Sequence, residues 1–514
     1  MRDVTGSSST SRRRPHVLLI MVDQLAASWL AAYGHPLVDT PAIDRLAGGA
    51  TVFESAYCPS PLCAPSRASL LTGRLPSRTG VYDNAADMRS SLPTLAHHLR
   101  AAGYRTSLAG KMHFVGPDQL HGFEERLTTD VYPADLDWTP DWRRPMTERF
   151  SWYHTMESVQ TPARCLASMQ MDYDDEVAFQ AVRRIYDHAR DPDRTPFFLT
   201  ASFTHPHDPW EVRSEYWDRY DPAAIEPPAV GRLPFGEADP HSRRLREMFA
   251  AEDAEVTDEQ VRAARHGYFA AVSYVDARVG EILHALDDTR LADDTIVVFT
   301  SDHGEMLGER GLWYKMSFYE HSARVPLLIR APGGAAAHRV ASPVSLLDLV
   351  PTVLDLADRR PDHLDVDGVS LAGLVAGGIG DRGAPVVAEY LAEGVTAPAV
   401  MVRSGAHKLI RCPGDPDLLY DLDADPDEVD DLAGKPEHAA TLAALGAEAD
   451  ARWDLDLLDH QVRASQRDRI SVAPALAGGV RTDWDFSPRV DGSAVYVRSH
   501  TNMYDLQRRS RLES

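Results

Sequence analysis

The sequence predicts an α/β fold in which a mainly parallel β-sheet is sandwiched by helices and is followed by a smaller C-terminal subdomain with an antiparallel sheet. From Val17 to about Pro332, short apolar runs alternate with amphipathic stretches, which is the pattern of a parallel sheet covered by helices. After about residue 385, short strand-like runs follow one another with turn residues between them. A chain of 514 residues can bury a large core and form more than one domain.

Local patterns predict the individual elements of the main domain. The short apolar runs that predict buried strands are Val17–Val22, Phe197–Phe203 and Thr295–Thr300. Leu92–Ala101 and Val261–Leu286 have apolar residues at helical spacing, so both are expected to be helices.

The C-terminal part is expected to contain short antiparallel strands at Val400–Val402, Lys408–Arg411 and Leu418–Asp421, with a turn at Ser404-Gly405 and a helix near 437–452. The last fifty residues show little helical or strand periodicity but contain the aromatic residues Trp484, Phe486, Tyr496 and Tyr504. Aromatic residues in a tail of this kind predict that it docks on a protein surface. The expected regions are a disordered N-terminus at 1–14, an α/β domain at 15–385, an α+β subdomain at 386–455 and a C-terminal extension at 456–514.

Charge and cysteine content narrow the class of protein. A formal net charge of −24 argues against nucleic-acid binding, which needs a basic face. Four cysteines without CxxC spacing are too few for a disulfide scaffold in a chain of this length. The apolar run that follows Arg12-Arg13-Arg14 is interrupted by Asp23 too early for a signal peptide, and no other run is long enough to span a bilayer. We therefore expect a cytoplasmic protein that binds neither nucleic acid nor a membrane.

Chemistry is indicated by a cysteine motif and by two aspartates. The motif is Cys63-Ala64-Pro65-Ser66-Arg67, continuing to Leu71-Thr72-Gly73-Arg74. A cysteine beside an arginine is either a thiolate nucleophile, with its pKa lowered by the cation, or a loop cysteine before a helix. Asp23 and Asp302 each follow a predicted strand directly. Since ligands gather at the carboxyl ends of strands in α/β sheets, we expect both aspartates to share one site.

The complete cysteine motif resembles the signature C-x-P-S-R-x-x-x-L-T-G-R of formylglycine-dependent (type I) sulfatases. The resemblance implies the alkaline-phosphatase-like fold for the domain at 15–385, which would then be the catalytic domain. It also implies that a formylglycine-generating enzyme oxidises Cys63 to formylglycine, and that a divalent metal lies beside it.

The metal ligands implied by the resemblance are Asp23, Gln24, residue 63, Asp302 and His303. Most sulfatases have Asp at the position of Gln24, and often Asn at that of His303; Asp-Gln and Asp-His pairs resemble choline sulfatases and phosphonate monoester hydrolases. Oxygen-rich ligation favours Ca²⁺, with Mn²⁺ or Mg²⁺ as alternatives.

Other segments are similar to further family elements. Gly110-Lys111-Met112-His113 resembles the G-K-x-H element, Thr204-His205-Pro206-His207 resembles a T-H-x-P-type loop, and Lys315 follows Asp302 at the family's distance. The resemblance implies that Arg67, Lys111 and Lys315 hold the sulfate oxygens. It implies that His205 protonates the leaving group and that His113 removes a proton from residue 63 when sulfate departs.

Within the family, Gly80–Asn84, Gly116–Arg126 and Glu389–Gly394 resemble choline sulfatase segments. The expected substrate is therefore choline O-sulfate. A quaternary ammonium group cannot donate hydrogen bonds, so its site should consist of aromatic faces and a carboxylate. Trp138 is the expected cation–π face, Asn84 and His154 line the pocket, and Glu393 rather than Glu389 is the expected counter-charge.

Three alternatives stay open: a phosphonate or phosphodiester monoester hydrolase, an arylsulfatase, and a non-catalytic binder on the same scaffold. The C-terminal extension resembles one that serves subunit association in choline sulfatases, so a homo-oligomer, dimer or tetramer, is expected. Tyr504 and Asp505 would then lie near a neighbouring subunit's pocket. The alternative is a tail that covers only its own subunit.

Overall fold

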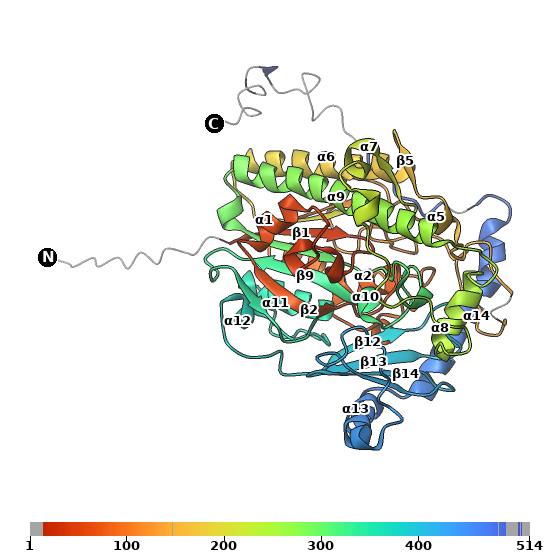
Figure 1. Ribbon diagram of the computed structural model, residues 1–514. Helices are drawn as coiled ribbons and strands as arrows, with labels where there is room; N and C mark the ends of the chain where they lie inside the picture. The colour runs from red at the N-terminus through yellow and green to blue at the C-terminus, as the bar shows by residue number, and fades with distance from the viewer. Residues whose placement is uncertain (1–13, 146–147, 482, 490–501, 504, 506–514) are drawn as a thin grey trace.

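The computed structural model describes residues 14–145, 148–481, 483–489, 502, 503 and 505. Within these residues, the centre of the molecule is a nine-stranded sheet in the order β10-β2-β9-β8-β1-β6-β3-β4, with β11 paired to β2 (Figure 1). Its strands are β1 (His16–Val22), β2 (Thr51–Tyr57), β3 (Arg105–Gly110), β4 (Glu125–Arg126), β6 (Phe197–Ser202), β8 (Thr295–Ser301), β9 (Arg324–Arg330), β10 (His338–Val340) and β11 (Val344–Ser345).

The sheet is mainly parallel, as the sequence predicts. β1 pairs in parallel with both β6 and β8, and β9 runs antiparallel to its neighbours β8 and β2. β1, β6 and β8 are buried along their whole length, which explains their near-continuous apolar sequences. The three strands expected near 17–22, 197–203 and 295–300 are confirmed.

Helices cover the sheet in two groups. One contains α1 (Pro41–Ala47), α6 (Met169–Ala189) and α9 (Asp258–Asp288) (Figure 1). α1 and α6 both pack on α9, α6 also contacts β3 and β6, and α1 contacts β9. The other contains α2 (Cys63–Thr72), α4 (Leu95–Ala101) and α11 (Leu349–Leu356), which also pack on one another. α9 confirms the expected long helix. α4 begins at Leu95 rather than Leu92, because the Thr94 side chain caps the helix by accepting from the His97 amide.

A second, antiparallel sheet is formed by β12 (Val386–Tyr390), β13 (Ala399–Ser404), β14 (His407–Arg411) and β15 (Leu418–Asp421). Helix α13 (Ala439–Arg452) packs against β13 and β14. The strands and the helix expected in this part of the chain are therefore present.

One expectation for the C-terminus is wrong. The helix α14 (Leu455–Ala477) extends well into the last fifty residues, where little regular structure was expected. Its buried side chains are Leu458, Val462, Gln466 and Arg469, at helical spacing. Because two of the four buried side chains are polar, the sequence of this helix does not show the regular spacing of apolar residues that predicts a buried helix face. Of the four tail aromatics, Tyr496 and Tyr504 lie outside the described residues.

The shorter elements are α3 (Pro76–Thr79), α5 (Glu157–Gln160), α7 (Ser214–Trp217), α8 (Pro240–Met248), α10 (Glu320–Ala323), α12 (Ala372–Val375), β5 (Ala163–Cys165) and β7 (Glu211–Arg213). Among the described helices, none combines the length and apolar character that crossing a bilayer requires.

Candidate active site

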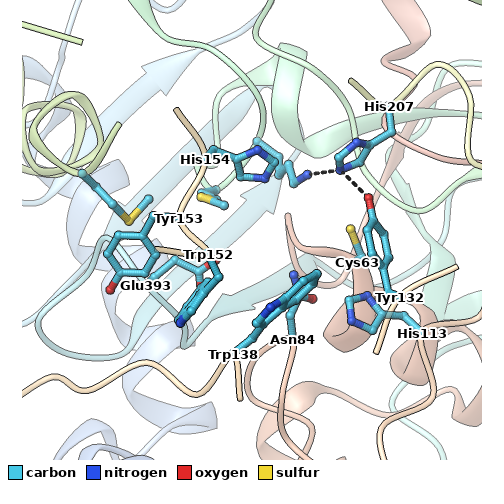
Figure 2. A pocket seen from close by; sticks show the side chains of 13 residues that line it. Cys63, Asn84, His113, Tyr132, Trp138, Trp152, Tyr153, His154, His207 and Glu393 are labelled. Atoms are coloured by element: carbon cyan, nitrogen blue, oxygen red, sulfur yellow. Dashed lines mark hydrogen bonds between the residues drawn. The ribbon is translucent and has the colours of Figure 1, made fainter. Parts of the chain in front are cut away.

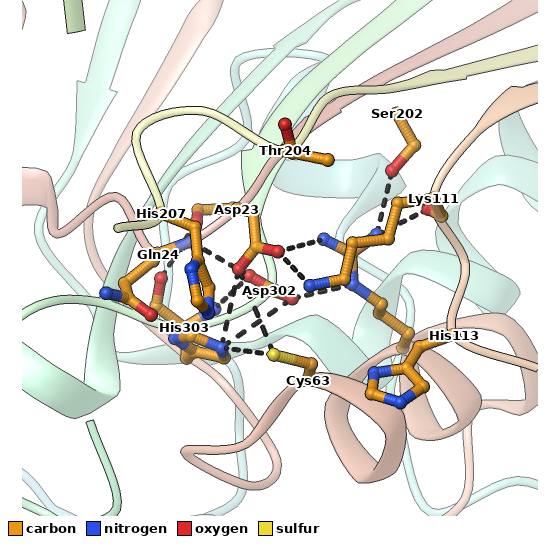
Figure 3. A network of polar contacts seen from close by, with 12 residues as sticks. Asp23, Gln24, Cys63, Lys111, His113, Ser202, Thr204, His207, Asp302 and His303 are labelled. Atoms are coloured by element: carbon orange, nitrogen blue, oxygen red, sulfur yellow. Dashed lines mark hydrogen bonds and ion pairs between the residues drawn. The ribbon is translucent and has the colours of Figure 1, made fainter. Parts of the chain in front are cut away.

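The cysteine of the sequence motif lies where the central strands end. Cys63 is the first residue of α2, whose ten residues are all buried. Asp23 follows β1 and Asp302 follows β8, and the parallel pairing of Val22 with Ser301 brings the two carboxylates to the same edge of the sheet. The Cys63 Sγ lies 3.2 Å from His303 Nε2 and 4.0 Å from Asp23 Oδ1 (Figure 3).

These residues form a compact set of metal ligands. One ligand atom each from Asp23, Cys63, Asp302 and His303 lies within 4.8 Å of the other three, and all four residues are buried. Burial alone would raise the pKa of Asp23, yet Lys111, His207 and Arg67 hold it down to about 2. Two carboxylates with an imidazole and an amide oxygen nearby fit a hard divalent cation.

The amide oxygen belongs to Gln24, whose orientation is set by Glu305. The Gln24 Nε2 donates to Glu305 Oε2 over 2.6 Å, so the Gln24 Oε1 faces Lys315 Nζ at 2.6 Å. The other Glu305 oxygen accepts from the backbone amides of Leu307 and Tyr314. An amide at position 24 can donate to Glu305 and accept from Lys315 at the same time, so Gln24 fits both of its neighbours.

Three buried cations surround the same point. Arg67 donates from Nε to Asp302 Oδ2 at 2.6 Å and from Nη1 to Ser202 Oγ at 2.8 Å, and its buried Nη2 has no hydrogen-bond partner among the described residues. Lys111 Nζ bonds to Asp23. Burial would raise the pKa of the Cys63 thiol, but Lys111, Lys315 and His303 hold it well below its ordinary value. The site is thus built to bind an anionic group at residue 63.

A pocket leads from Cys63 toward the surface (Figure 2). Its aromatic lining consists of Tyr132, Trp138, Trp152 and Tyr153, and its polar lining includes Asn84, His113, His154, His207, Lys315 and Glu393. All four residues expected to bind the substrate, Asn84, Trp138, His154 and Glu393, line this one pocket.

Glu393 is the buried carboxyl group of the pocket. Burial, followed by the nearby Asp83 carboxylate, raises the pKa of Glu393 to about 8. Its Oε2 has no hydrogen-bond partner among the described residues. Glu389 does not line the pocket, because its carboxylate accepts from the Ser77 amide and hydroxyl and from Trp453 Nε1.

The structure contradicts the choice of His205 as the proton donor. Its ring is buried outside the pocket lining, with Nδ1 2.7 Å from Asp174 Oδ2. His207, two residues later, lines the pocket instead: its Nε2 lies 2.9 Å from Lys315 Nζ and its Nδ1 2.7 Å from the Asp208 carbonyl oxygen. The motif Thr204-His205-Pro206-His207 contains both histidines, and only the course of the loop decides which one faces the pocket.

Sequence reasoning also missed Tyr132, Trp152 and Tyr153 as pocket residues. Trp152 and Tyr153 belong to an aromatic segment visible in the sequence, but only packing shows that they line the site. Tyr132 gave no sequence signal; its ring lies 4.2 Å from Lys111 Nζ, and its hydroxyl lies 3.4 Å from His207 Nε2.

Comparison with known proteins agrees with this geometry. Residues 15–359 match the family model described as Sulfatase. The chain belongs to the sulfatase family. Further models match residues 308–452 of this sulfatase (N-sulphoglucosamine sulphohydrolase, C-terminal) and residues 460–512 (Choline sulfatase enzyme C terminal).

Individual relatives of this sulfatase include a choline-sulfatase of Rhizobium meliloti, 47% identical over 506 residues that cover 97% of this chain and 98% of the relative. An iduronate 2-sulfatase of Mus musculus is 33% identical over 352 residues, covering 64% of this chain and 61% of the relative. Among solved structures, a phosphonate monoester hydrolase of Agrobacterium radiobacter superposes with a TM-score of 0.68 at 27% identity, covering 88% of this chain and 96% of that one. The alkaline-phosphatase-like fold expected for this sulfatase is confirmed.

Proposed function

We propose that this sulfatase hydrolyses choline O-sulfate to choline and sulfate. The observation that carries the proposal is a single pocket with two chemically different ends. Buried cations and candidate metal ligands surround Cys63 at one end, and Trp138, Trp152 and Tyr153 lie with Glu393 toward the other. Aromatic faces and a carboxylate are the groups that recognise a quaternary ammonium. The nearly full-length similarity to a choline-sulfatase supports the same substrate.

The reaction is proposed to need a matured residue 63 and a metal. A formylglycine-generating enzyme would convert Cys63 to formylglycine, and the Sγ marks where the reactive oxygen of the aldehyde hydrate would stand. Asp23, Gln24, Asp302 and His303 would hold the metal with residue 63, Ca²⁺ being favoured and Mn²⁺ or Mg²⁺ the alternatives. When bound, the metal would favour deprotonation of the nucleophile and balance charge on the sulfate.

The chain's own groups have distinct roles in this scheme. Arg67, Lys111 and Lys315 bind the sulfate oxygens, where negative charge is concentrated in the transition state. Protonated on both ring nitrogens, His207 donates from Nδ1 to the Asp208 carbonyl and gives its Nε2 proton to the choline oxygen as the bond between that oxygen and sulfur breaks. The Asp208 carboxylate, 3.2 Å from Nδ1, balances the imidazolium charge. His113, which lines the pocket beside residue 63, takes a proton from residue 63 when sulfate is released.

The substrate assignment is tested with choline sulfate and its uncharged carbon analogue, 3,3-dimethylbutyl sulfate. A desolvated cation–π contact is worth ~2 kcal/mol, so kcat/KM for choline sulfate should be higher by about 30-fold. Mass spectrometry of the peptide with residue 63 must first show conversion to formylglycine. Equal values for the two esters would exclude an ammonium site.

Phosphonate monoester hydrolysis is the second candidate, favoured by the fold similarity to a phosphonate monoester hydrolase. An aryl sulfate and a phosphonate monoester therefore belong in the same turnover comparison. If either is turned over faster than choline sulfate, the arylsulfatase or phosphonate alternative replaces the proposal.

His207→Ala should affect esters according to their leaving groups. For choline sulfate we expect kcat to fall by about 10²–10⁴-fold, because an alkoxide needs a proton as it departs. For 4-nitrophenyl sulfate the loss should be much smaller, because the nitrophenolate is stable without one. His205→Asn is the matched control and should leave the ratio between the two esters unchanged. Equal losses on both esters in His207→Ala would rule out His207 as the proton donor.

The raised pKa of the Glu393 carboxyl group predicts how KM for choline sulfate depends on pH. The groups that influence its carboxyl are Asp83, Lys315 and Cys63, and Tyr153 and Tyr390 lie close to it. With a pKa of about 8, the Glu393 carboxyl is mostly neutral below that pH and becomes an anion above it. Since the anion attracts an ammonium group, KM for choline sulfate should fall as pH rises through about 8.

The control for this prediction is the uncharged ester, whose KM reflects every other titrating group in the site. Glu393→Gln should raise KM for choline sulfate and make its pH profile parallel to that of 3,3-dimethylbutyl sulfate. Parallel profiles already in the unmodified enzyme would remove Glu393 as the counter-charge.

The chain is further proposed to form a homo-oligomer, a dimer or a tetramer, through the extension at 456–514. The first helix of this region, α14, packs on its own subunit through Gln466 and Arg469. Tyr504 lies outside the described residues, so a role of Tyr504 and Asp505 at a neighbouring pocket stays a prediction.

A further inference from the structure

The two ends of the pocket are held by different parts of the fold. Cys63, Asp23 and Asp302 are placed by α2, β1 and β8, elements of the main sheet and its helical cover. The residues of the other end come from three loops that are distant in sequence, which carry Asn84, Trp138 and Glu393. Each of these loops is bonded directly or through one neighbour to α14.

Arg469 of α14 joins two of the loops. Its Nη1 and Nη2 donate to the two carboxylate oxygens of Asp83, each at 2.6 Å, in a bidentate pair whose side chains are 5% and 0% exposed. The same Nη1 lies 3.2 Å from Thr139 Oγ1. Asp83 precedes Asn84 and Thr139 follows Trp138, so both contacts are one residue away from a pocket side chain.

Gln466 and Arg463, on the same face of α14, hold the third loop through Trp142. The Gln466 Oε1 accepts from the Trp142 amide at 3.1 Å, and the Arg463 guanidinium lies 5.3 Å from the centre of the Trp142 ring. Trp142 Nε1 donates to the Ala392 carbonyl at 2.7 Å, directly before Glu393. Arg463 also donates to the Thr396 carbonyl over 2.6 Å.

The Asn84 loop has a further link to the nucleophile. Asn84 Oδ1 accepts from the backbone amide of Ala64 over 3.0 Å, next to Cys63 in the first turn of α2. A shift of the Asp83–Asn84 segment would therefore move Asn84, which forms part of the pocket wall. The cations and metal ligands around residue 63, in contrast, are bonded to one another and not to α14.

We propose that α14 is a specificity element that positions the ammonium end of the pocket, with Arg469 as its main positioning residue. The identity of the ligand rests on the proposed function, but the contacts do not. Without Arg469, the buried Asp83 carboxylate has lost its bidentate cation, and the loops of Asn84 and Trp138 have lost their common anchor. The cations and metal ligands around residue 63 keep their contacts with one another. Loss of Arg469 should therefore weaken recognition of the alcohol part of the ester without disabling the chemistry.

The test compares Arg469→Gln with Arg467→Ala, a control on the exposed side of the same helix. For Arg469→Gln we expect KM for choline sulfate to rise about tenfold, which corresponds to the loss of 1.4 kcal/mol of binding, while kcat changes much less. KM for methyl sulfate, which lacks the ammonium end, should change little. Arg467→Ala should leave both KM values unchanged.

Two further variants separate positioning from a general effect on folding. Arg469→Lys keeps the charge but cannot span both Asp83 oxygens, so its KM for choline sulfate should lie between those of the unmodified enzyme and Arg469→Gln. Asp83→Asn combined with Arg469→Gln leaves no buried charge unpaired. This double variant carries the same test if Arg469→Gln does not fold, and melting temperatures are recorded for all variants.

The outcomes distinguish this inference from the proposed substrate. If the unmodified enzyme does not prefer choline sulfate to 3,3-dimethylbutyl sulfate, the proposed function is wrong. If it does prefer choline sulfate, three results for the Arg469 variants would show that α14 does not position the ammonium end. These are an equal change in KM for choline sulfate and methyl sulfate, an unchanged KM for choline sulfate, or a fall in kcat alone. A selective rise in KM for choline sulfate with intermediate behaviour of the lysine variant supports the inference.

Discussion

Replacing Cys63 by alanine is expected to abolish sulfate release. Among the described residues that line the pocket, Cys63 is the only cysteine, serine or threonine, and the cations and metal ligands converge on its Sγ. Removing the nucleophile of an enzyme costs on the order of 10⁶ in kcat, since the remaining groups are arranged around an atom that is then missing. Initial rates of sulfate release and the mass of the peptide with residue 63 check this result.

The fold should survive this change, because a small side chain at the first position of α2 is exchanged for a smaller one. An unchanged melting temperature is the control. Cys63→Ser should be equally inactive in a host whose maturation enzyme oxidises only cysteine, although serine places a hydroxyl at this position. Near-normal turnover by the alanine variant would show that residue 63 is not the nucleophile.

The second large effect is expected for Asp302→Asn. Asp302 accepts from Arg67 Nε at 2.6 Å and shares the ligand cluster with Asp23, Cys63 and His303. An amide retains the shape but removes one of the two carboxylate charges that would bind the metal. We expect the metal content of the purified protein, measured by elemental analysis, to fall. We expect kcat to fall with it by about 10³-fold or more, since metal and nucleophile act as one unit.

Asp423→Asn, on an exposed carboxylate of the C-terminal subdomain, is the matched control and should change neither metal content nor rate. Chelation is the complementary experiment on the unmodified enzyme. Full activity in protein that elemental analysis shows to be free of divalent metal would exclude a metal-dependent reaction, whatever the Asp302 variant does.

The fold class and the grouping of residues at the proposed sulfate end could be predicted from the sequence, because both depend on local patterns. Continuous apolar runs identify strands that are buried on both faces, and a residue directly after such a strand must lie at the carboxyl edge of the sheet. Asp23 and Asp302 were therefore predictable as neighbours once β1 and β8 were recognised. The motif at Cys63 added the proposed nucleophile and Arg67 from a single continuous segment.

Tertiary structure alone decided which loop and helix residues complete the site. His205 and His207 are two residues apart in one motif, and only the path of their loop turns His207 to the pocket and His205 to Asp174. α14 escaped recognition because its buried face includes Gln466 and Arg469, which are satisfied by partners more than three hundred residues away in sequence. Polar groups can be buried when they have such distant hydrogen-bond partners, and the local pattern of hydrophobic residues does not reveal these partners.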